Sequence, residues 1–168
     1  MSLSTALTGL TVHLPAPKQL RDLLADLLGR DVSLRPSPPF AVSPMYPASI
    51  GTFVDDQLRI RAAIAYDVPL SAYVGAALAL VPASGAETAI ADAELGETIS
   101  EGLSEVFNVM ASMFNIEGSE HLRLYQAHLT GQQLPHDARA RTQVLGRRED
   151  FAVEVAGYGT GRVAIVLT

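Results

Sequence analysis

The sequence predicts an α+β protein in which helices cover one antiparallel sheet. The first observation is the order of patterns along the chain, which runs helix, hairpin, two helices and then three strands. The second is the composition: 48% of the 168 residues are hydrophobic and only 6% are aromatic, so Ala, Val and Leu must build the interior. The third is the length, which suits one domain with a substantial core. We expect residues 1–168 to form this single domain, with 1–16 as a poorly determined leader.

Apolar spacing and prolines define the elements of the first quarter. The alternation over Leu10–Leu14 indicates a short strand. Lys18–Leu28 has leucines at steps of three and four and is followed by Gly29, which predicts a helix with a glycine stop. Five prolines in Arg35–Pro47 exclude a helix and favour an extended crossing segment.

The next segments predict a hairpin, a helix and a loop. Ser49–Val54 and Leu58–Tyr66 have strand character and are joined by a short polar turn. Pro69 suits the first turn of a helix over Leu70–Leu80. The small and polar residues of Ala83–Ala91 predict a loop.

The C-terminal third predicts strands separated by loops and turns. A strand is expected over Leu122–Leu129, a polar loop follows, and a strand begins at Val144–Leu145. Alternation over Phe151–Ala156 and the apolar run Arg162–Leu167 predict the last two strands. The polar loop is Gly131–Arg141, and the turn between the last two strands is Gly157–Gly161.

One long helix, expected over Asp92–Asn115, carries the candidate site. Its apolar face consists of Leu95, Ile99, Leu103, Val106, Met110 and Met113, with Phe107 and Phe114 beside it. A second stripe, which we call the polar row, consists of Glu101, Glu105, Asn108 and Ser112 at steps of four, three and four. Asn is a mediocre residue inside a helix, because its amide competes for backbone groups. A compensating role for Asn108 is therefore expected.

Two plainer interpretations of this row remain open. Asn108 can form hydrogen bonds inside a packed interface, and Glu105 can be an ordinary solvated acid. Exposure of both side chains together would favour a functional row, whereas burial of both against their own domain would exclude it.

Composition and spacing argue against several other classes of function. A net charge of −6 without a basic cluster disfavours nucleic acid, and the apolar stretch Leu70–Val81 is too short to cross a bilayer. We see no signal peptide and expect a cytoplasmic protein without a membrane partner. The chain has no Cys. Its histidines lack metal-ligand spacing, so no metal site is expected; they are His13, His121, His128 and His136.

The order of elements and the central helix resemble the CheC/CheX/FliY family of chemotaxis phosphatases, and CheX above all. The family signature is Glu-x-x-Asn on a helix, and Glu105-Val106-Phe107-Asn108 matches it. The first helix ends in Leu28-Gly29, as the family's first helix tends to end. A Pro-containing segment, a hairpin and a short helix of small residues follow in the family's order. The resemblance covers roughly residues 17–168 and implies a CheX/CheC-like fold.

Three positions depart from the family pattern. Members usually have Asp or Ser where this chain has Glu101, and Gly where it has Ser112. Members often have Pro where it has Gly131. The Glu–Asn pair itself is intact.

The resemblance implies a phosphatase that acts on a phosphorylated, CheY-like response regulator in chemotaxis signalling. Asn108 would orient the attacking water, and Glu105 would form a salt bridge with the regulator's active-site Lys. Glu101 and Ser112 would contact the partner. Mg²⁺ would be held by the regulator, and this chain would bind no cofactor. Two alternatives are a binding module of the same fold without catalysis, and a structural protein in which the row is an interface.

A homodimer is also expected. Arg162–Leu167 is short, apolar and close to the C-terminus, and as an exposed edge strand it would invite pairing with a second chain. The resemblance implies the same assembly, because CheX-like proteins form dimers through their sheets.

Overall fold

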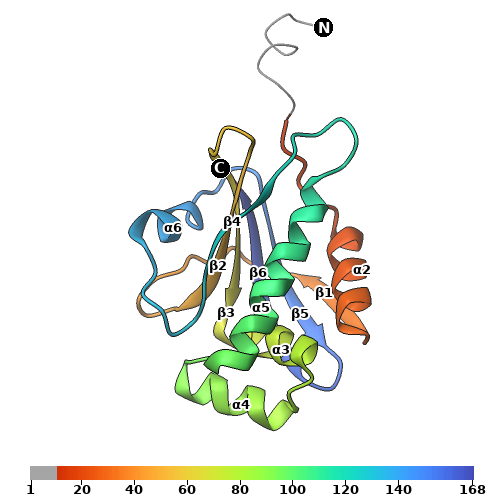
Figure 1. Ribbon diagram of the computed structural model, residues 1–168, viewed down its shortest axis with the longest axis vertical. Coiled ribbons are helices and arrows are strands. Elements are labelled where there is room, and N and C mark those ends of the chain that lie inside the picture. Colours follow the sequence, from red (N-terminus) through yellow and green to blue (C-terminus); the bar gives the residue numbers. More distant parts are fainter. Residues whose placement is uncertain (1–10) are drawn as a thin grey trace, which may run out of the picture.

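The computed structural model describes residues 11–168, in which six strands form one antiparallel sheet (Figure 1). The strand order is β1-β5-β6-β3-β2-β4, and each neighbouring pair is antiparallel. The strands are Val32–Pro36 (β1), Ala48–Val54 (β2), Ile60–Asp67 (β3), Arg123–His128 (β4), Arg148–Val155 (β5) and Gly159–Leu167 (β6). The helices are Pro17–Leu28 (α2), Val68–Ala79 (α3), Ala83–Asp92 (α4), Gly96–Met110 (α5) and His136–Arg141 (α6), and a 3-10 turn, Ala111–Phe114 (η1), follows α5.

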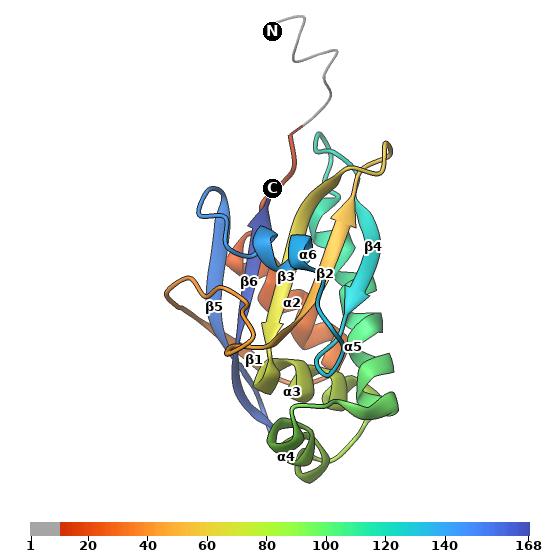
Figure 2. The same cartoon turned by 90° about the vertical axis from the view of Figure 1, so that its left-hand side faces the viewer.

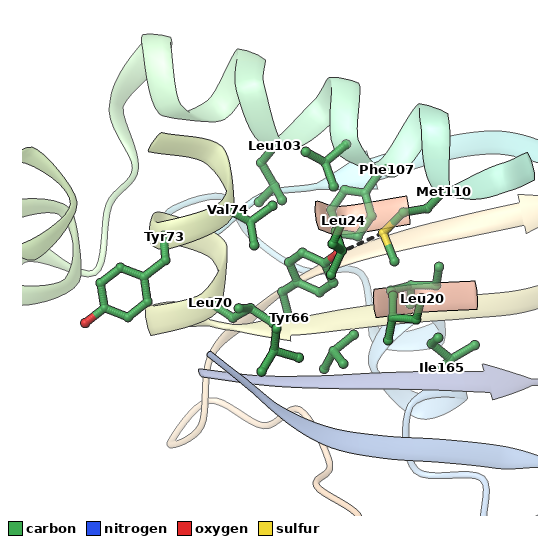
Figure 3. Close-up of a cluster of buried hydrophobic side chains, with 14 of the residues drawn as sticks. Leu20, Leu24, Tyr66, Leu70, Tyr73, Val74, Leu103, Phe107, Met110 and Ile165 are labelled. Carbon is green, nitrogen blue, oxygen red and sulfur yellow. Dashed lines mark hydrogen bonds between the residues drawn. The ribbon is translucent and has the colours of Figure 1, made fainter. Parts of the chain in front are cut away.

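The helices α2, α3 and α5 cover one face of the sheet, which we call the helical face (Figures 1 and 2). Large side chains fill the space between them and the sheet, as Figure 3 shows. The ring of Tyr66 on β3 lies 5.3 Å from that of Phe107 on α5, and the Tyr66 hydroxyl donates to Met110 Sδ at 2.8 Å. Burial strongly raises the pKa of this hydroxyl. The helical face therefore holds α5 with an apolar core.

The other face, the back face, is covered by α6 and the segment that precedes β2 (Figure 2). Small residues line it, and a buried ion pair fixes its cover: Arg148 Nε and Asp150 Oδ2 are 2.8 Å apart, with side chains 6% and 4% exposed. The guanidinium also donates to the backbone oxygens of Thr142 and Val144, both at 2.8 Å, and to that of Phe40 at 3.2 Å. Because these bonds reach both the segment after α6 and the segment before β2, the pair joins two parts of the cover to β5.

The expected long helix over Asp92–Asn115 is wrong in its extent. The chain turns between α4 and α5, where Ala93 has φ 50° and Gly96 has φ 74°, both left-handed. Leu95 is buried inside this turn. The segment Ala83–Ala91, which was expected to be a loop, instead belongs to the helix α4. Periodicity did not reveal the break, because Leu95 fits the apolar spacing of α5 although it precedes the helix.

The prediction that Arg162–Leu167 is an exposed edge is wrong. β6 is bonded to β5 on one side and to β3 on the other. Its apolar run is explained by burial on both faces of the sheet. The edges are β1 and β4, so the sequence-based reason for a homodimer does not hold.

Other expectations need smaller corrections. Strand β1 was missed, and the expected loop Gly131–Arg141 contains α6. Val144–Leu145 lies in the irregular segment between α6 and β5 instead of a strand. Residues 11–14 form no strand, and Leu10, the first residue of that expected strand, lies outside the described residues. The first helix, the hairpin, α3 and the last two strands are confirmed within a few residues.

Candidate functional site

Close helix packing fixes the position of α5. A Cβ at Gly75 on α3 would lie 2.6 Å from the Ile99 carbonyl oxygen, and a Cβ at Gly102 would overlap the Gly75 carbonyl. The two backbones therefore approach one another as closely as only glycine permits. Further along α5, the ring of Phe107 covers Gly51 on β2, where a Cβ would lie 2.8 Å from Phe107 Cδ1. Because both contacts involve the buried side of α5, its opposite side faces solvent.

The polar row lies on that solvent side. Glu101, Glu105, Asn108 and Ser112 are all exposed, whereas the flanking Val106 and Phe107 are buried. Asn108 is therefore not a buried, structurally bonded asparagine. The structure brings all four predicted residues onto one exposed stripe: Glu101, Glu105 and Asn108 lie on α5, and Ser112 lies on the η1 turn that follows it.

The Glu105 and Asn108 side chains form no hydrogen bond or ion pair with any residue in the described range 11–168. Ser112 differs, because its hydroxyl donates to the Val109 carbonyl oxygen at 2.8 Å. Its one hydrogen is used within the helix, and only its lone pairs remain for a partner. The Glu–Asn pair thus has its full hydrogen-bonding capacity available.

The row belongs to a long stretch of the sequence without basic residues. Between Arg61 and Arg123 the chain has no Lys or Arg. The same stretch contains nine acids: Asp67, Glu87, Asp92, Glu94, Glu97, Glu101, Glu105, Glu117 and Glu120. The carboxylates of the row therefore lack nearby counter-charges in sequence, and a partner with a basic surface would supply them.

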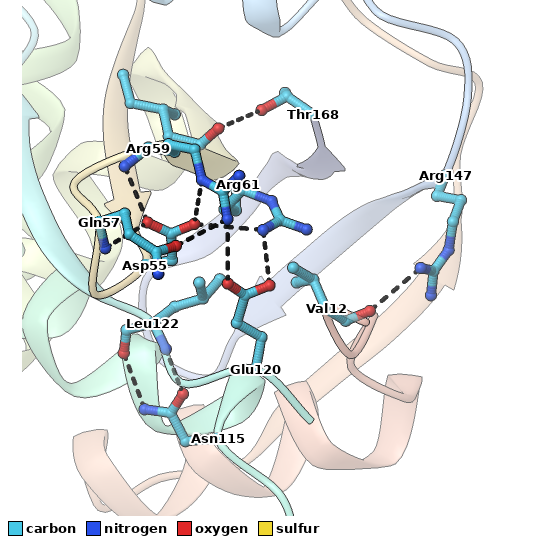
Figure 4. Close-up of polar contacts among 11 residues, drawn as sticks. Val12, Asp55, Gln57, Arg59, Arg61, Asn115, Glu120, Leu122, Arg147 and Thr168 are labelled. Atoms are coloured by element: carbon cyan, nitrogen blue, oxygen red, sulfur yellow. Dashed lines mark hydrogen bonds and ion pairs between the residues drawn. The ribbon is translucent and has the colours of Figure 1, made fainter. Parts of the chain in front are cut away.

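A second polar cluster, which the sequence analysis missed, lies where β2 joins β3 (Figure 4). Asp55 is 1% exposed and accepts from the backbone N–H groups of Gln57 at 2.9 Å and Arg59 at 3.0 Å. Its carboxylate also accepts from Arg59 Nε at 2.8 Å and Arg61 Nη1 at 3.3 Å, and Arg61 bonds Glu120 at 2.6 Å. The available signal was Asp55 at the turn of a hairpin with Arg at positions 59 and 61.

These contacts set the charge of Asp55. Burial alone would raise the pKa of the Asp55 carboxyl. The hydrogen bonds from the backbone N–H groups of Arg59 and Gln57 and from the two guanidinium groups lower the pKa by more than burial raises it. The pKa therefore lies well below its ordinary value. In this cluster the acids and the arginines pair with one another. The ion pairs connect the β2–β3 hairpin to the segment before β4, which indicates a structural role.

Gly131, one of the departures from the family pattern, has a structural explanation. Its φ is 98°, which proline cannot adopt because its ring holds φ near −65°. A Cβ at this position would also lie 3.2 Å from Glu94 Cγ in the α4–α5 turn. This loop therefore follows a path that requires glycine.

Within residues 11–168, no three His, Asp or Glu side chains are grouped as metal ligands, and no helix is long and apolar enough to span a membrane. The row itself consists of carboxylate, amide and hydroxyl groups on the outer side of a helix. Such an arrangement can contact a macromolecule and orient a water molecule.

Comparison with known proteins identifies the fold. No family model matches the sequence, and no curated protein is similar to it. The structure superimposes on FliM from a FliM–SpeE complex of H. pylori with a TM-score of 0.59 and 8% identity, over 90% of this chain and 80% of that one. The FliM middle domain of Vibrio alginolyticus superimposes with a TM-score of 0.56 and 11% identity, over 89% of this chain and 86% of that one.

FliY of Thermotoga maritima gives a TM-score of 0.51 and 13% identity, over 92% of this chain and 84% of that one. At these identities the likeness concerns the fold alone. Six antiparallel strands with the helical layer described above match these structures along most of their length. The chain therefore has the CheC/CheX/FliY fold.

Proposed function

We propose that the polar row of α5 docks a phosphorylated, CheY-like response regulator and that this chain accelerates hydrolysis of its phospho-aspartate. The observation that carries the proposal is the joint exposure of Glu105 and Asn108 on a helix fixed by glycine contacts, with no hydrogen bond or ion pair from either side chain to residues 11–168. The fold supports it, because it is the fold that the Glu-x-x-Asn resemblance implied. The action would take place in the cytoplasm.

The proposed chemistry requires positioning more than acid–base catalysis. A water oxygen attacks phosphorus in line, the bond between phosphorus and the aspartyl oxygen breaks, and phosphate and a free aspartate result. The Asn108 amide can accept a hydrogen bond from the water and donate another without changing its protonation state. Mg²⁺ would be held by the regulator, where it neutralises phosphoryl charge, and this chain would not bind it.

Glu105 and Glu101 would position the regulator. Glu105 lies one helical turn before Asn108, so a regulator whose phosphoryl group lies at Asn108 would present neighbouring cations to it. Its proposed partner is the regulator's active-site Lys. Glu101 would add a second charge at the rim, and Ser112 would accept a hydrogen bond at the other end of the row.

A docking module without catalysis is the second candidate. The observation that favours it is the superposition on FliM from H. pylori, a protein whose structure was determined in complex with another protein, SpeE. The substitution of Ser112 for the family's glycine also places a side chain next to the proposed catalytic position. In this candidate the row recognises the regulator and hydrolysis proceeds at the regulator's own rate.

Phosphate release from a panel of phosphorylated response regulators tests the proposal. We expect Asn108→Ala to lower the accelerated rate by about 10²–10³-fold while binding is mostly retained, since it removes a group that positions the transition state. Glu105→Ala should mainly weaken binding, and Glu105→Gln should weaken it less. Thr98→Ala, an exposed change on α5 outside the row, is the matched control.

The outcomes separate the two candidates. Equal release by wild type and Asn108→Ala on every regulator, with binding intact, would leave the docking module. Absence of binding to every regulator would reject both candidates. The homodimer stays a prediction supported by the resemblance alone, and a monomeric mass in light scattering at micromolar concentration would contradict it.

A further inference from the structure

The helix α2 lies beside the edge strand β1 (Figure 1), and a groove lies between them. It has a volume of about 480 Å³ and is lined by Pro17, Lys18, Arg21, Ser33 and Leu34. Leu34 is half-buried and packs on the core of the helical face, so it forms an apolar floor. One wall is a helix and the other is a strand with a free edge.

The register of β1 shows which backbone groups face that edge. Ala156 N–H donates to Asp31 O at 3.0 Å, and Ser37 N–H donates to Asp150 O at 3.1 Å. Both pairs continue the register of β1 with β5, so alternate residues starting from Asp31 direct their backbone groups toward β5. The intervening Val32 and Leu34 direct their N–H and C=O groups outward.

Pro36 occupies the next outward position, where its missing N–H costs the sheet no hydrogen bond. Among residues 11–168, the backbone groups of the β1 edge left without a strand partner are therefore those of Val32 and Leu34, and Pro36 follows them. Val32 is only 7% exposed, so Leu34, which lines the groove, is the more open of the two. A strand of three or four residues fits such an edge.

The charged residues that line the groove are both basic. Lys18 and Arg21 have side chains 77% and 48% exposed. Asp22 contacts both of them, at 2.6 Å and 3.1 Å, so two cations share one acid. Arg35 is a further exposed cation on the strand, on the opposite face of the sheet, where Glu154 on β5 bonds Ser33.

We propose that the β1–α2 groove binds an extended, acidic peptide segment of another protein, which adds a strand to β1 and places carboxylates against Lys18 and Arg21. Backbone pairing at Val32 and Leu34 supplies affinity, and the two cations select acidic sequences. A second copy of this chain is a poorer occupant. Two-fold pairing of β1 with itself would bring Lys18 and Arg21 of both copies to the same side of the joint, and like charges would repel.

The test uses the full chain and a fluorescein-labelled nine-residue peptide of alternating Glu and Val, with fluorescence anisotropy as the readout. We expect saturable binding that the Lys18→Glu/Arg21→Glu double variant weakens at least tenfold. Arg123→Glu, a reversal at an exposed position of the other edge strand β4, should change binding less than twofold. A peptide of alternating Lys and Val, and the Glu-Val peptide N-methylated at every residue, should not bind.

Amide hydrogen exchange by NMR locates the contact. The N–H groups of Val32 and Leu34 should exchange more slowly in the presence of the Glu-Val peptide, whereas the amides of β4 should not change. Lack of binding, equal binding by the double variant, or protection at β4 instead of β1 would overturn the proposal. So would a concentration-dependent dimer that protects Leu34 without any peptide, because the occupant would then be a second copy.

Discussion

Two groups of carboxylates in this molecule have opposite surroundings. Asp55 is buried and accepts hydrogen bonds from two backbone N–H groups and two arginines, and Asp150 is buried against Arg148. Glu101 and Glu105 are exposed on α5 and belong to a stretch without Lys or Arg. The chain has 12 basic and 18 acidic residues, so acids outnumber the basic side chains that could pair with them.

This difference separates acids that stabilise the fold from acids that are available to bind a partner. A buried carboxylate must be paired, because its desolvation would otherwise destabilise the fold. An exposed, unpaired carboxylate contributes little to stability and keeps its capacity to bind a partner. The polar row can therefore vary without loss of the fold, whereas the two buried acids cannot.

The strongest test of this comparison removes one buried acid. Asp150→Ala leaves Arg148 buried without its counter-ion and should lower the free energy of unfolding by about 3–5 kcal/mol. Glu105→Ala should change it by less than about 0.5 kcal/mol. Urea denaturation at pH 7 measures both. A similar cost for the two variants would show that Glu105 has a structural role.

A second test uses acid. The pKa of Asp55 is lowered in the folded protein, so the unfolded chain binds more protons, and the stability that Asp55 provides is lost as pH falls below about 5. Asp55→Asn should be less stable than wild type at pH 7, and the difference should shrink steadily toward pH 2. Burial raises the pKa of Asp67 and Glu149, but these groups titrate alike in both proteins. A constant difference across this range would contradict the depressed pKa.

The smallest expected effect is at the rim of the row. If the row docks a basic surface, Glu101→Gln should weaken binding of the response regulator by no more than about fivefold at low salt, because an exposed pair is worth about 0.2–1 kcal/mol. Added salt should abolish the difference. Asp22→Asn is the control, since Asp22 is exposed on α2 and already paired with Lys18. Equal weakening by both changes would point to net charge instead of local contact.

The spacing of apolar residues predicted those helices and strands whose type depends only on their own residues. The helix Pro17–Leu28 follows from its leucine spacing and Gly29, and β3 follows from alternation. The four residues of the polar row also followed from spacing alone, because residues three and four apart share one face of a helix. Their exposure did not follow, since the same spacing would fit a buried polar seam.

Pattern failed where distant segments decide the outcome. The end of α4 and the start of α5 depend on how α5 crosses α3 at Gly75 and Gly102, a contact between residues far apart in the sequence. Strand β1 was missed because Pro36 and the prolines that follow it argued against pairing, although Pro36 stands at an outward position of an edge strand. The pairing of Asp55 with Glu120 through Arg61 was equally invisible, because 65 positions separate the two acids.

The sequence by itself determined the fold class, most of the elements and the stripe that contains Glu105 and Asn108, because periodicity and turn residues act over a few positions. Only the tertiary structure decided that β6 is central and β1 is an edge, since strand order depends on long-range pairing. Among the residues that the structure describes, it also decided which carboxylates are neutralised and which have no ion-pair partner. Charge pairing depends on distance in space, and neighbouring positions in the sequence do not fix that distance.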